Sequence, residues 1–272
     1  MALVQGAAPL PGLRPGPRAS NAGGAGEDAP LYVPGPEGPW EEVADRLDDV
    51  GRAVVCTTWG QWLTAVLLDP ALRPLLGEDW PRFRQTPAAA GRMRFAVSRF
   101  VMKYTAATAL DVPVHTLELG YGPGGRPELR GLGSGVEVSL AHTDELVVVG
   151  VSRTGPIGVD AEPADREVSV GLLRGHVCTA EENAVLDALP EDERRARLLW
   201  LWTLKEAYTK ALGHGGRRRF STFGFGLDGE GRVALTEAAD ARAAEPVAGE
   251  WSFATHLVQD RYLVSEAHRA RR

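Results

Sequence analysis

Residues 158–162 read Gly-Val-Asp-Ala-Glu and are predicted to form the centre of a short strand. Side chains alternate between the two faces of a strand, so Asp160 and Glu162 are expected on one face while Val159 and Ala161 turn toward the core. Two carboxylates this close repel each other unless a cation lies between them. Hard oxygen ligands on a rigid strand suit Mg²⁺, although such a pair by itself is more often a solvated strand end.

Residues 202–210 read Trp-Thr-Leu-Lys-Glu-Ala-Tyr-Thr-Lys and lie in a helix predicted over about residues 191–212. Glu206 and Lys210 are four positions apart and share a face of this helix. Trp202 lies one turn before Glu206, which indicates a partly sheltered acid that needs a partner. An exposed Glu206–Lys210 ion pair explains this segment equally well when the segment is taken alone.

Together the two segments resemble the signature pair of the 4'-phosphopantetheinyl transferases. That pair is a Gly-Ile/Val-Asp-x-Glu strand and, about forty residues later, a Trp-x-x-Lys-Glu-Ala-x-x-Lys helix closed by Gly-x-Gly, here Gly213 and Gly215. Upstream, residues 125–127 (Gly-Arg-Pro) resemble the family's Gly-Lys-Pro, and residues 139–143 (Ser-Leu-Ala-His-Thr) resemble its Asn-x-Ser-His-Ser. The resemblance covers about residues 82–227, with departures at Arg126, Ser139 and Ala141.

This resemblance implies an α+β fold of two similar halves in one chain, with coenzyme A in the cleft between them. The chain looks like the larger, two-halved type of the family, such as the surfactin-synthetase activators, for which a monomer is expected. We expect the halves at residues 40–155 and 156–272. Residues 1–39 are rich in Pro, Gly and Ala and are predicted to be a disordered tail.

The resemblance also implies the reaction, a transfer of 4'-phosphopantetheine from coenzyme A to a serine of an apo carrier protein. Asp160, Glu162 and Glu206 would surround Mg²⁺, with Mn²⁺ as the alternative ion, and Glu206 would be the general base, directly or through water. Lys210 would hold a phosphate oxygen as a point charge. The residues implied to bind coenzyme A are Lys103, Arg126, His142, Lys205 and, as a weaker candidate, Arg84.

The acceptor implied by the resemblance is an acyl, polyketide or peptidyl carrier protein, as used by fatty-acid or natural-product synthases. Carrier proteins of this kind are acidic, so their docking surface should be apolar or positively charged. Residues 168–177 fit this description, since they offer Leu172 and Leu173 beside Arg174. A buried helix is the alternative for the leucines.

Composition limits the other functions. The chain has 272 residues and a formal net charge of −6, which disfavours a broad nucleic-acid-binding surface. Its two cysteines lack metal-ligand spacing, and no apolar run approaches the roughly 20 residues that span a bilayer, so we expect a reducing cytoplasm and no membrane. The N-terminus does not read as a signal peptide.

Two other functions are compatible with parts of the pattern. A Mg²⁺-dependent nucleotide hydrolase would usually carry a phosphate-binding Gly-x-x-x-x-Gly-Lys-Ser/Thr loop, which the sequence lacks. A non-catalytic module that binds coenzyme A or a carrier protein would be expected to lose a metal carboxylate, yet all three acids are present. The transferase is therefore the favoured prediction.

Overall fold

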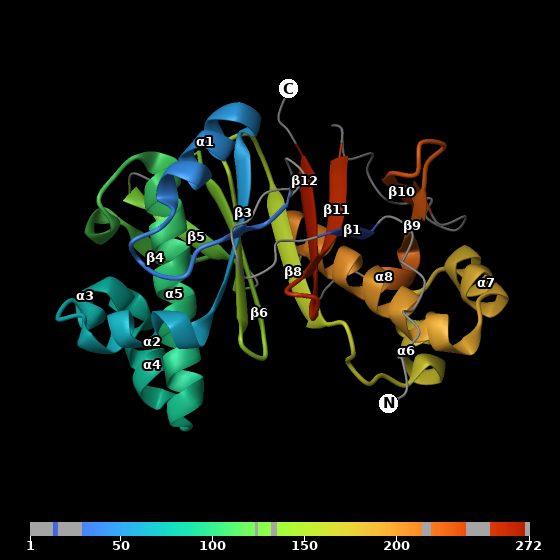
Figure 1. The fold of residues 1–272 in the computed structure, drawn as a ribbon, viewed down its shortest axis with the longest axis horizontal. Coiled ribbons are helices and arrows are strands. Elements are labelled where there is room, and N and C mark those ends of the chain that lie inside the picture. Colours follow the sequence, from blue (N-terminus) through green and yellow to red (C-terminus); the bar gives the residue numbers. More distant parts are fainter. Residues whose placement is uncertain are drawn as a thin grey trace, which may run out of the picture.

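A computed structural model describes residues 13–15, 29–122, 125–131, 135–213, 219–237 and 251–269. Helices and strands are mixed along the chain, as predicted, and the strands gather mainly into two four-stranded sheets near the centre of the molecule (Figure 1). Within the described residues, no helix has both the length and the apolar character needed to cross a membrane.

The first part of the chain builds one sheet and the helices that cover it. Its elements are β2 (Leu31–Tyr32), α1 (Trp40–Val50), β3 (Arg52–Thr58), α2 (Trp59–Leu68), α3 (Leu72–Leu76), η1 (Gly77–Asp79), α4 (Trp80–Gln85), α5 (Ala89–Leu110), η2 (Val114–Thr116), β4 (Glu118–Tyr121), β5 (Pro127–Arg130), β6 (Glu137–Thr143) and β7 (Leu146–Ser152). The sheet order is β2-β3-β7-β6, and β7 pairs antiparallel with both β3 and β6. The long helix α5 lies on the outer face of this sheet (Figure 1).

The second part repeats the combination of a sheet and a long outer helix. Its elements are β8 (Ile157–Pro163), α6 (Val170–Val177), α7 (Ala180–Ala188), α8 (Glu191–Ala211), η5 (Phe220–Thr222), β9 (Phe223–Leu227), β10 (Val233–Glu237), β11 (Trp251–Val258) and β12 (Tyr262–Arg269). The sheet order is β1-β11-β12-β8, in which β1 (Leu13–Pro15) comes from the N-terminal part of the chain. β12 pairs antiparallel with both β11 and β8. β9 and β10 form a separate hairpin.

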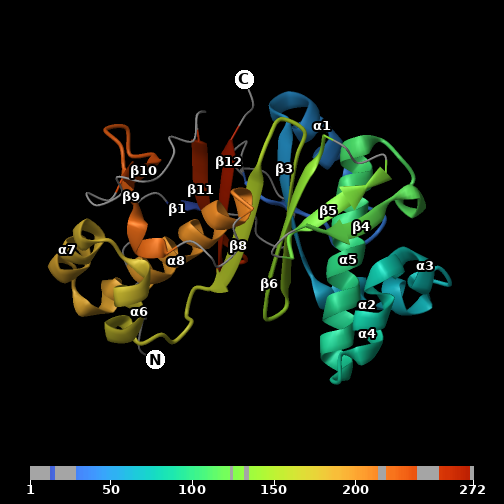
Figure 2. The same cartoon turned by 180° about the vertical axis from the view of Figure 1, so that it is seen from behind.

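The two sheets meet along β6 and β8, which both views place next to each other (Figures 1 and 2). Their shared interior is apolar, with Val148 and Val159 among its fully buried side chains. Ser139 on β6 adds a polar link, because its Oγ accepts a hydrogen bond of 3.1 Å from the backbone N–H of Val159 on β8. β7 is therefore covered on both faces, which explains why every one of its residues is buried.

The structure contradicts the expected disordered tail over residues 29–39. β2 pairs in parallel with β3, and Val33 is fully buried in the first core. The short strand β1 (Leu13–Pro15) pairs in parallel with β11. Composition suggested disorder because few large apolar residues are present, but backbone pairing with a distant strand does not depend on local composition. Residues 1–12 and 16–28 lie outside the described residues.

Deletion of residues 1–39 should therefore lower the free energy of unfolding by about 4 kcal/mol or more, since it empties the position of Val33 in the core. It also removes the Val33 carbonyl that accepts the hydrogen bond of buried Trp62 Nε1 at 3.1 Å. Deletion of residues 1–12 is the matched control and should change the stability little. Urea unfolding of both variants measures the difference, and equal stabilities would contradict the docked position of residues 29–39.

Candidate active site

The predicted strand–helix pair is present as β8 and α8, and a glycine sets their separation. Gly158 lies on the face of β8 that turns toward α8. A Cβ atom at this position would lie 1.9 Å from the Ala207 carbonyl oxygen and 2.5 Å from the Ala211 nitrogen. Only glycine permits this contact, so Gly158 holds the strand carboxylates of Asp160 and Glu162 against the helix.

Gly158→Ala should therefore push α8 away from β8 and lower the stability by about 3 kcal/mol, because the clash involves backbone atoms that cannot rotate aside. Gly171→Ala is the matched control, since nothing lies within 4 Å of its added Cβ and it stands on helix α6. Alanine there should be neutral or slightly stabilising. A Gly158→Ala variant with the melting temperature of the parent would show that the close approach is not required.

Asp160 is nearly buried, with 8% of its surface exposed. Its Oδ1 accepts a hydrogen bond of 2.7 Å from Lys210 Nζ, which also donates to the Val159 carbonyl at 3.0 Å. Its Oδ2 is buried and has no hydrogen-bond partner among the described residues. Burial raises the pKa of Asp160, and the nearby Lys210 opposes that rise. Oδ2 of Asp160 is thus a buried carboxylate oxygen that receives no hydrogen bond, which is energetically costly.

Glu162 and Glu206 lie in the same electrostatic environment. Burial raises the pKa of Glu162, with a further contribution from the charge of Asp160, while its ion pair with Arg166 and a hydrogen bond from Trp202 lower it. Trp202, which was expected to shelter Glu206, donates its hydrogen bond to Glu162. Burial also raises the pKa of half-buried Glu206, and the charges of Asp160 and Glu162 add to the rise. The three acids therefore repel one another, and Lys210 partly compensates their charge.

The charge of Lys210 also acts on His142. The imidazole of His142, on β6, has an exposed surface, yet desolvation by the surrounding protein lowers its pKa, and the charges of Arg99, Lys210 and Arg94 lower it further. Acids from β8 and α8 and cations from α5 and α8 thus lie near one another where the two sheets meet. This combination can hold an anionic substrate beside acidic groups, provided that a cation offsets the acids.

A divalent cation fits the chemistry of these acids, although the side chains are not arranged around one. Among the described residues, no three His, Cys, Asp or Glu side chains form a group that could hold a metal ion. Lys210 and Arg166 instead neutralise Asp160 and Glu162. The donor set consists of carboxylate oxygens, which Mg²⁺ prefers, and the unpaired Oδ2 of Asp160 is the atom that lacks a positive partner.

Three other residues were expected to bind coenzyme A, namely Lys103, Arg84 and Arg126. Lys103 is 3% exposed on α5, where burial lowers its pKa and the charges of Glu118 and Asp79 raise it. Arg84 is exposed on α4. Arg126 forms an ion pair of 2.8 Å with Glu137, and its Nη1 lies 3.5 Å from the Ala211 carbonyl at the end of α8. Only Arg126 of this set therefore contacts the second part of the chain.

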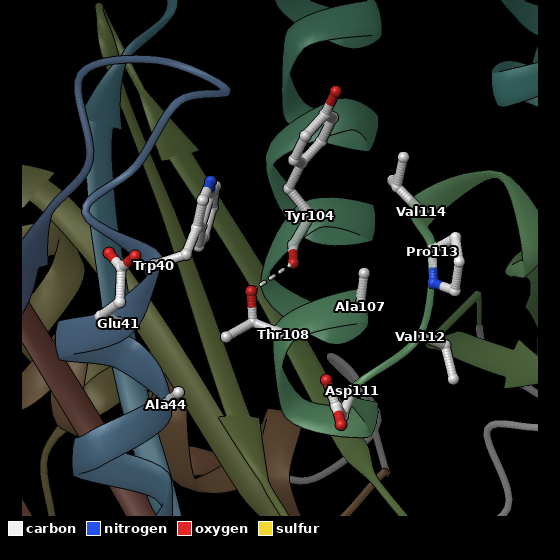
Figure 3. A pocket seen from close by; sticks show the side chains of 10 residues that line it. All are labelled: Trp40, Glu41, Ala44, Tyr104, Ala107, Thr108, Asp111, Val112, Pro113 and Val114. Carbon is white, nitrogen blue, oxygen red and sulfur yellow. Dashed lines mark hydrogen bonds between the residues drawn. The ribbon is translucent and has the colours of Figure 1, made fainter.

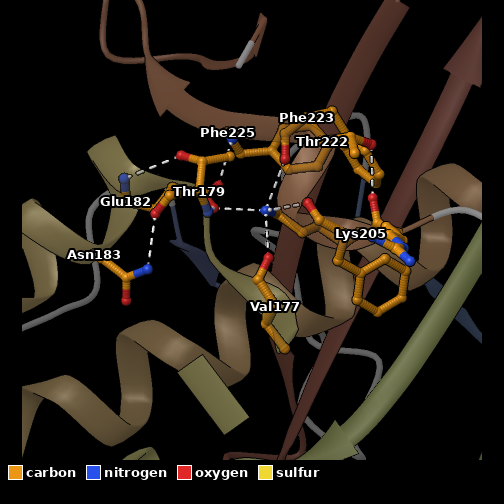
Figure 4. Close-up of polar contacts among 10 residues, drawn as sticks. Val177, Thr179, Glu182, Asn183, Lys205, Thr222, Phe223 and Phe225 are labelled. Atoms are coloured by element: carbon orange, nitrogen blue, oxygen red, sulfur yellow. Dashed lines mark hydrogen bonds and ion pairs between the residues drawn. The ribbon is translucent and has the colours of Figure 1, made fainter. Parts of the chain in front are cut away.

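Lys205 differs most clearly from the prediction. It is fully buried, and its ammonium donates to Glu182 Oε2 at 2.5 Å and to the carbonyls of Val177, Phe223 and Phe220 at 2.7, 2.8 and 3.0 Å (Figure 4). These acceptors use the whole donor capacity of an ammonium group. In this structure Lys205 therefore stabilises the core of the second part of the chain, and its ammonium group has no N–H left for a phosphate.

Two cationic side chains near His142 were missed. Arg99 donates to buried Asp79 at 2.9 Å and packs on Phe95, with 4.4 Å from its guanidinium carbon to the ring centroid. Arg94 lies over Trp59 at 5.4 Å. Both residues belong to the basic edge of helix α5, a signal that the sequence contains. The sequence does not show which basic residue of that edge turns toward His142.

A groove elsewhere in the first part contains none of the predicted site residues. It has a volume of about 560 Å³ and lies between α1, α5 and residues 112–114, with Trp40, Tyr104 and Asp111 among its lining side chains (Figure 3). The cluster around Asp160, Glu206 and Lys210 therefore remains the candidate active site.

The chain is a mixed α/β protein in which a strand with an Asp-x-Glu sequence packs against a helix with a Lys-Glu sequence. Comparison with known proteins places this combination in one class. Residues 156–265 match the model of the 4'-phosphopantetheinyl transferase superfamily. This region contains β8 and α8, so the match confirms for this part of the chain the resemblance noted in the sequence.

Particular relatives support the same family. The chain is 63% identical over 166 residues to the 4'-phosphopantetheinyl transferase pptA of Paxillus involutus, covering 54% of each chain. It is 30% identical over 160 residues to slr0495 of Synechocystis, covering 55% of this chain and 65% of that protein. It is 29% identical over 126 residues to the 4'-phosphopantetheinyl transferase HetI of Nostoc, covering 46% of this chain and 53% of HetI. The matches thus span between about half and two thirds of these relatives.

Proposed function

We propose that this chain is a 4'-phosphopantetheinyl transferase, which moves phosphopantetheine from coenzyme A to a serine hydroxyl of an apo carrier protein. The observation that carries the proposal is the crowding of Asp160, Glu162 and Glu206 beside Lys210, within the segment that matches the superfamily. Such crowding raises the energy of the protein unless a ligand supplies positive charge, which is typical of a functional site.

In the proposed reaction the serine oxygen forms a bond to the phosphorus that bears pantetheine. The phosphoanhydride bond breaks, and adenosine 3',5'-bisphosphate leaves with the bonding electrons. Glu206 accepts the serine proton, and its raised pKa brings it closer to the value that suits a general base. Lys210 and His142 are proposed to hold phosphate oxygens.

We propose Mg²⁺, with Mn²⁺ as the alternative, as the ion that Asp160, Glu162 and Glu206 would hold. When bound, the ion would supply positive charge for the pyrophosphate and for the charge that develops on the leaving oxygen. Arg126 is proposed to contact coenzyme A from the other side of the site. Lys103 becomes a weaker candidate because it is buried, and Arg84 stays the weaker candidate that the sequence indicated.

We further propose that the chain consists of two similar halves, at residues 40–155 and 156–272, with coenzyme A between them. The strand order supports this division. In the first part, the main elements in chain order are strand β3, the long helix α5 and strands β6 and β7. In the sheet, β7 lies between β3 and β6. The second part has the same order in β8, α8, β11 and β12. A two-halved chain would act as a monomer, and we place it in the cytoplasm, with no membrane or nucleic acid as partner.

The distinguishing experiment measures release of adenosine 3',5'-bisphosphate from coenzyme A, with and without an apo carrier protein, in the presence of Mg²⁺. A transferase should release the nucleotide only when the acceptor is present, in a one-to-one ratio with modified carrier protein. Release without an acceptor would identify a hydrolase. Binding of coenzyme A without release, across a panel of acyl and peptidyl carrier proteins, would identify a binding module.

The acceptor is proposed to dock on helix α6. Leu172 on this helix is 76% exposed, so it offers an apolar contact, whereas Leu173 packs against the second core. Arg174 is less suited to steering than the sequence suggested, because its guanidinium donates to Asn183 Oδ1 and to Asp187 Oδ1, both at 2.7 Å. Arg174 therefore ties α6 to α7, and Leu172 offers the cleaner test.

Leu172→Asp should raise the KM for the carrier protein about tenfold, because it places a negative charge against an acidic partner and removes an apolar contact. The KM for coenzyme A should stay constant. Leu68→Asp is the matched control, since Leu68 is 77% exposed on α2 in the first part of the chain. Equal KM values for the carrier protein in the two variants would show that the carrier protein does not dock on α6.

A further inference from the structure

A second cavity lies in the C-terminal part, between α7, α8 and the β9–β10 hairpin. Its volume is about 350 Å³, and its apolar lining includes Val185, Leu201, Phe225 and Leu227. Leu201 and Phe225 are buried, whereas Val185 and Leu227 expose 48% and 40% of their surfaces and so flank the opening. A concave, apolar and partly enclosed space of this size is typical of a site for a small molecule.

The cavity also contains a buried cation. Arg197 on α8 lines it, is 9% exposed, and has its guanidinium carbon 4.0 Å above the Trp200 ring. Its Nη1 is buried and has no hydrogen-bond partner among the described residues. Burial lowers the pKa of Arg197, and the charge of Glu182 opposes that change. A buried guanidinium donor without an acceptor is costly, so a ligand that supplies the acceptor would be favoured.

Glu182, the buried acid that lines the cavity with Arg197, is already satisfied. Glu182 Oε2 accepts hydrogen bonds from Lys205 Nζ at 2.5 Å and from the Thr179 N–H at 2.8 Å, and its Oε1 accepts from the Phe225 N–H at 2.8 Å. Lys205 balances the charge of Glu182, so Glu182 does not need Arg197 as a partner. Among the buried groups at this cavity, the Glu182–Lys205 pair is neutral and Arg197 adds one positive charge.

We propose that this cavity binds a small organic monocarboxylate, with the carboxylate on Arg197 and an apolar body against Leu201 and Phe225. A monoanion fits because the exposed acid Glu181 at the edge of the cavity would repel a second negative charge. The site is separate from the candidate active site. Arg197 and Glu206 lie about two and a half turns apart on α8, which places their side chains on opposite faces of the helix.

The test uses octanoate as the probe and measures its binding to the full chain by ligand-observed NMR titration. Octanoate should bind with a dissociation constant of the order of 1 mM, as expected for a ligand of this size. Octanol, which has the chain without the charge, and acetate, which has the charge without the chain, should each bind at least tenfold more weakly.

Two variants identify the site, with their folds checked by circular dichroism. Arg197→Met keeps the apolar stem and should weaken octanoate binding at least tenfold. Val185→Trp fills the opening from an exposed position and should also abolish binding, whereas Val50→Trp, at another partly exposed valine on α1, should not. If Arg197→Met does not fold, Val185→Trp decides the question. The proposal is overturned if wild-type protein shows no saturable octanoate binding, if octanol binds equally well, or if Val185→Trp binds like wild type.

Discussion

Glu206→Gln should lower the turnover of phosphopantetheine transfer by a factor of about 10³ or more, because it removes both the proposed base and one proposed metal ligand. The stability should stay constant or rise, since the substitution removes one of three mutually repelling acids. Turnover at saturating coenzyme A and Mg²⁺, together with thermal unfolding, measures both effects. The combination of lost activity and retained stability separates a role in the reaction from a role in the fold.

Glu191→Gln provides the control for this variant, because Glu191 is an exposed acid in the first turn of the same helix. It should leave turnover unchanged. Near-normal turnover of Glu206→Gln at saturating Mg²⁺ would show that Glu206 has no role in the reaction. The raised pKa of this acid would then have no functional explanation. Asp160→Asn should behave like Glu206→Gln, since Asp160 contributes the carboxylate oxygen that lacks a partner.

Lys205→Met should lower the free energy of unfolding by about 3–5 kcal/mol, because it leaves the buried Glu182 carboxylate without its cation. Three backbone carbonyls, those of Val177, Phe220 and Phe223, also lose a hydrogen bond. Urea unfolding measures the change. Adding Glu182→Gln should restore part of the lost stability, because the unpaired charge is then gone.

Lys210→Met is the matched control for Lys205→Met, since the side chain of Lys210 is 29% exposed and lies beside the candidate active site. Lys210→Met should lower the free energy of unfolding less than Lys205→Met does, and it should lower the turnover more. If Lys205→Met instead kept the parent stability and raised the KM for coenzyme A, the sequence-based assignment of Lys205 to phosphate binding would be correct.

The local features of the motif could be predicted from the sequence because they depend on nearby residues. Val159 and Ala161 turn to the core, as strand alternation requires. The helix ends at Ala211, and Gly213, just after the C-cap, has a φ of +72° and donates its N–H to the Lys210 carbonyl. The capping box of Thr179 and Glu182 that opens α7 is a local pattern of the same kind.

The contacts that decide the roles of the lysines could not be predicted, because they join segments far apart in the chain. Lys205 and Lys210 stand on one helix, and periodicity does not show which of them faces acids from β8 and which faces Glu182 on α7. Ser139 was noted as a departure from the family pattern, and its hydrogen bond with Val159 on β8 could not be predicted from the sequence either. The docking of residues 29–39 likewise depends on pairing with β3, which their composition does not indicate.

The central claim is that this chain transfers phosphopantetheine, and intact-mass analysis of an apo carrier protein tests it most directly. Several apo acyl and peptidyl carrier proteins are incubated with coenzyme A, Mg²⁺ and either the wild-type chain or Glu206→Gln. We expect at least one carrier protein to gain the mass of a single phosphopantetheine group with the wild-type chain, and none to gain it at a comparable rate with Glu206→Gln. Unchanged masses for every carrier protein with the wild-type chain, under conditions in which a known transferase modifies them, would contradict the account.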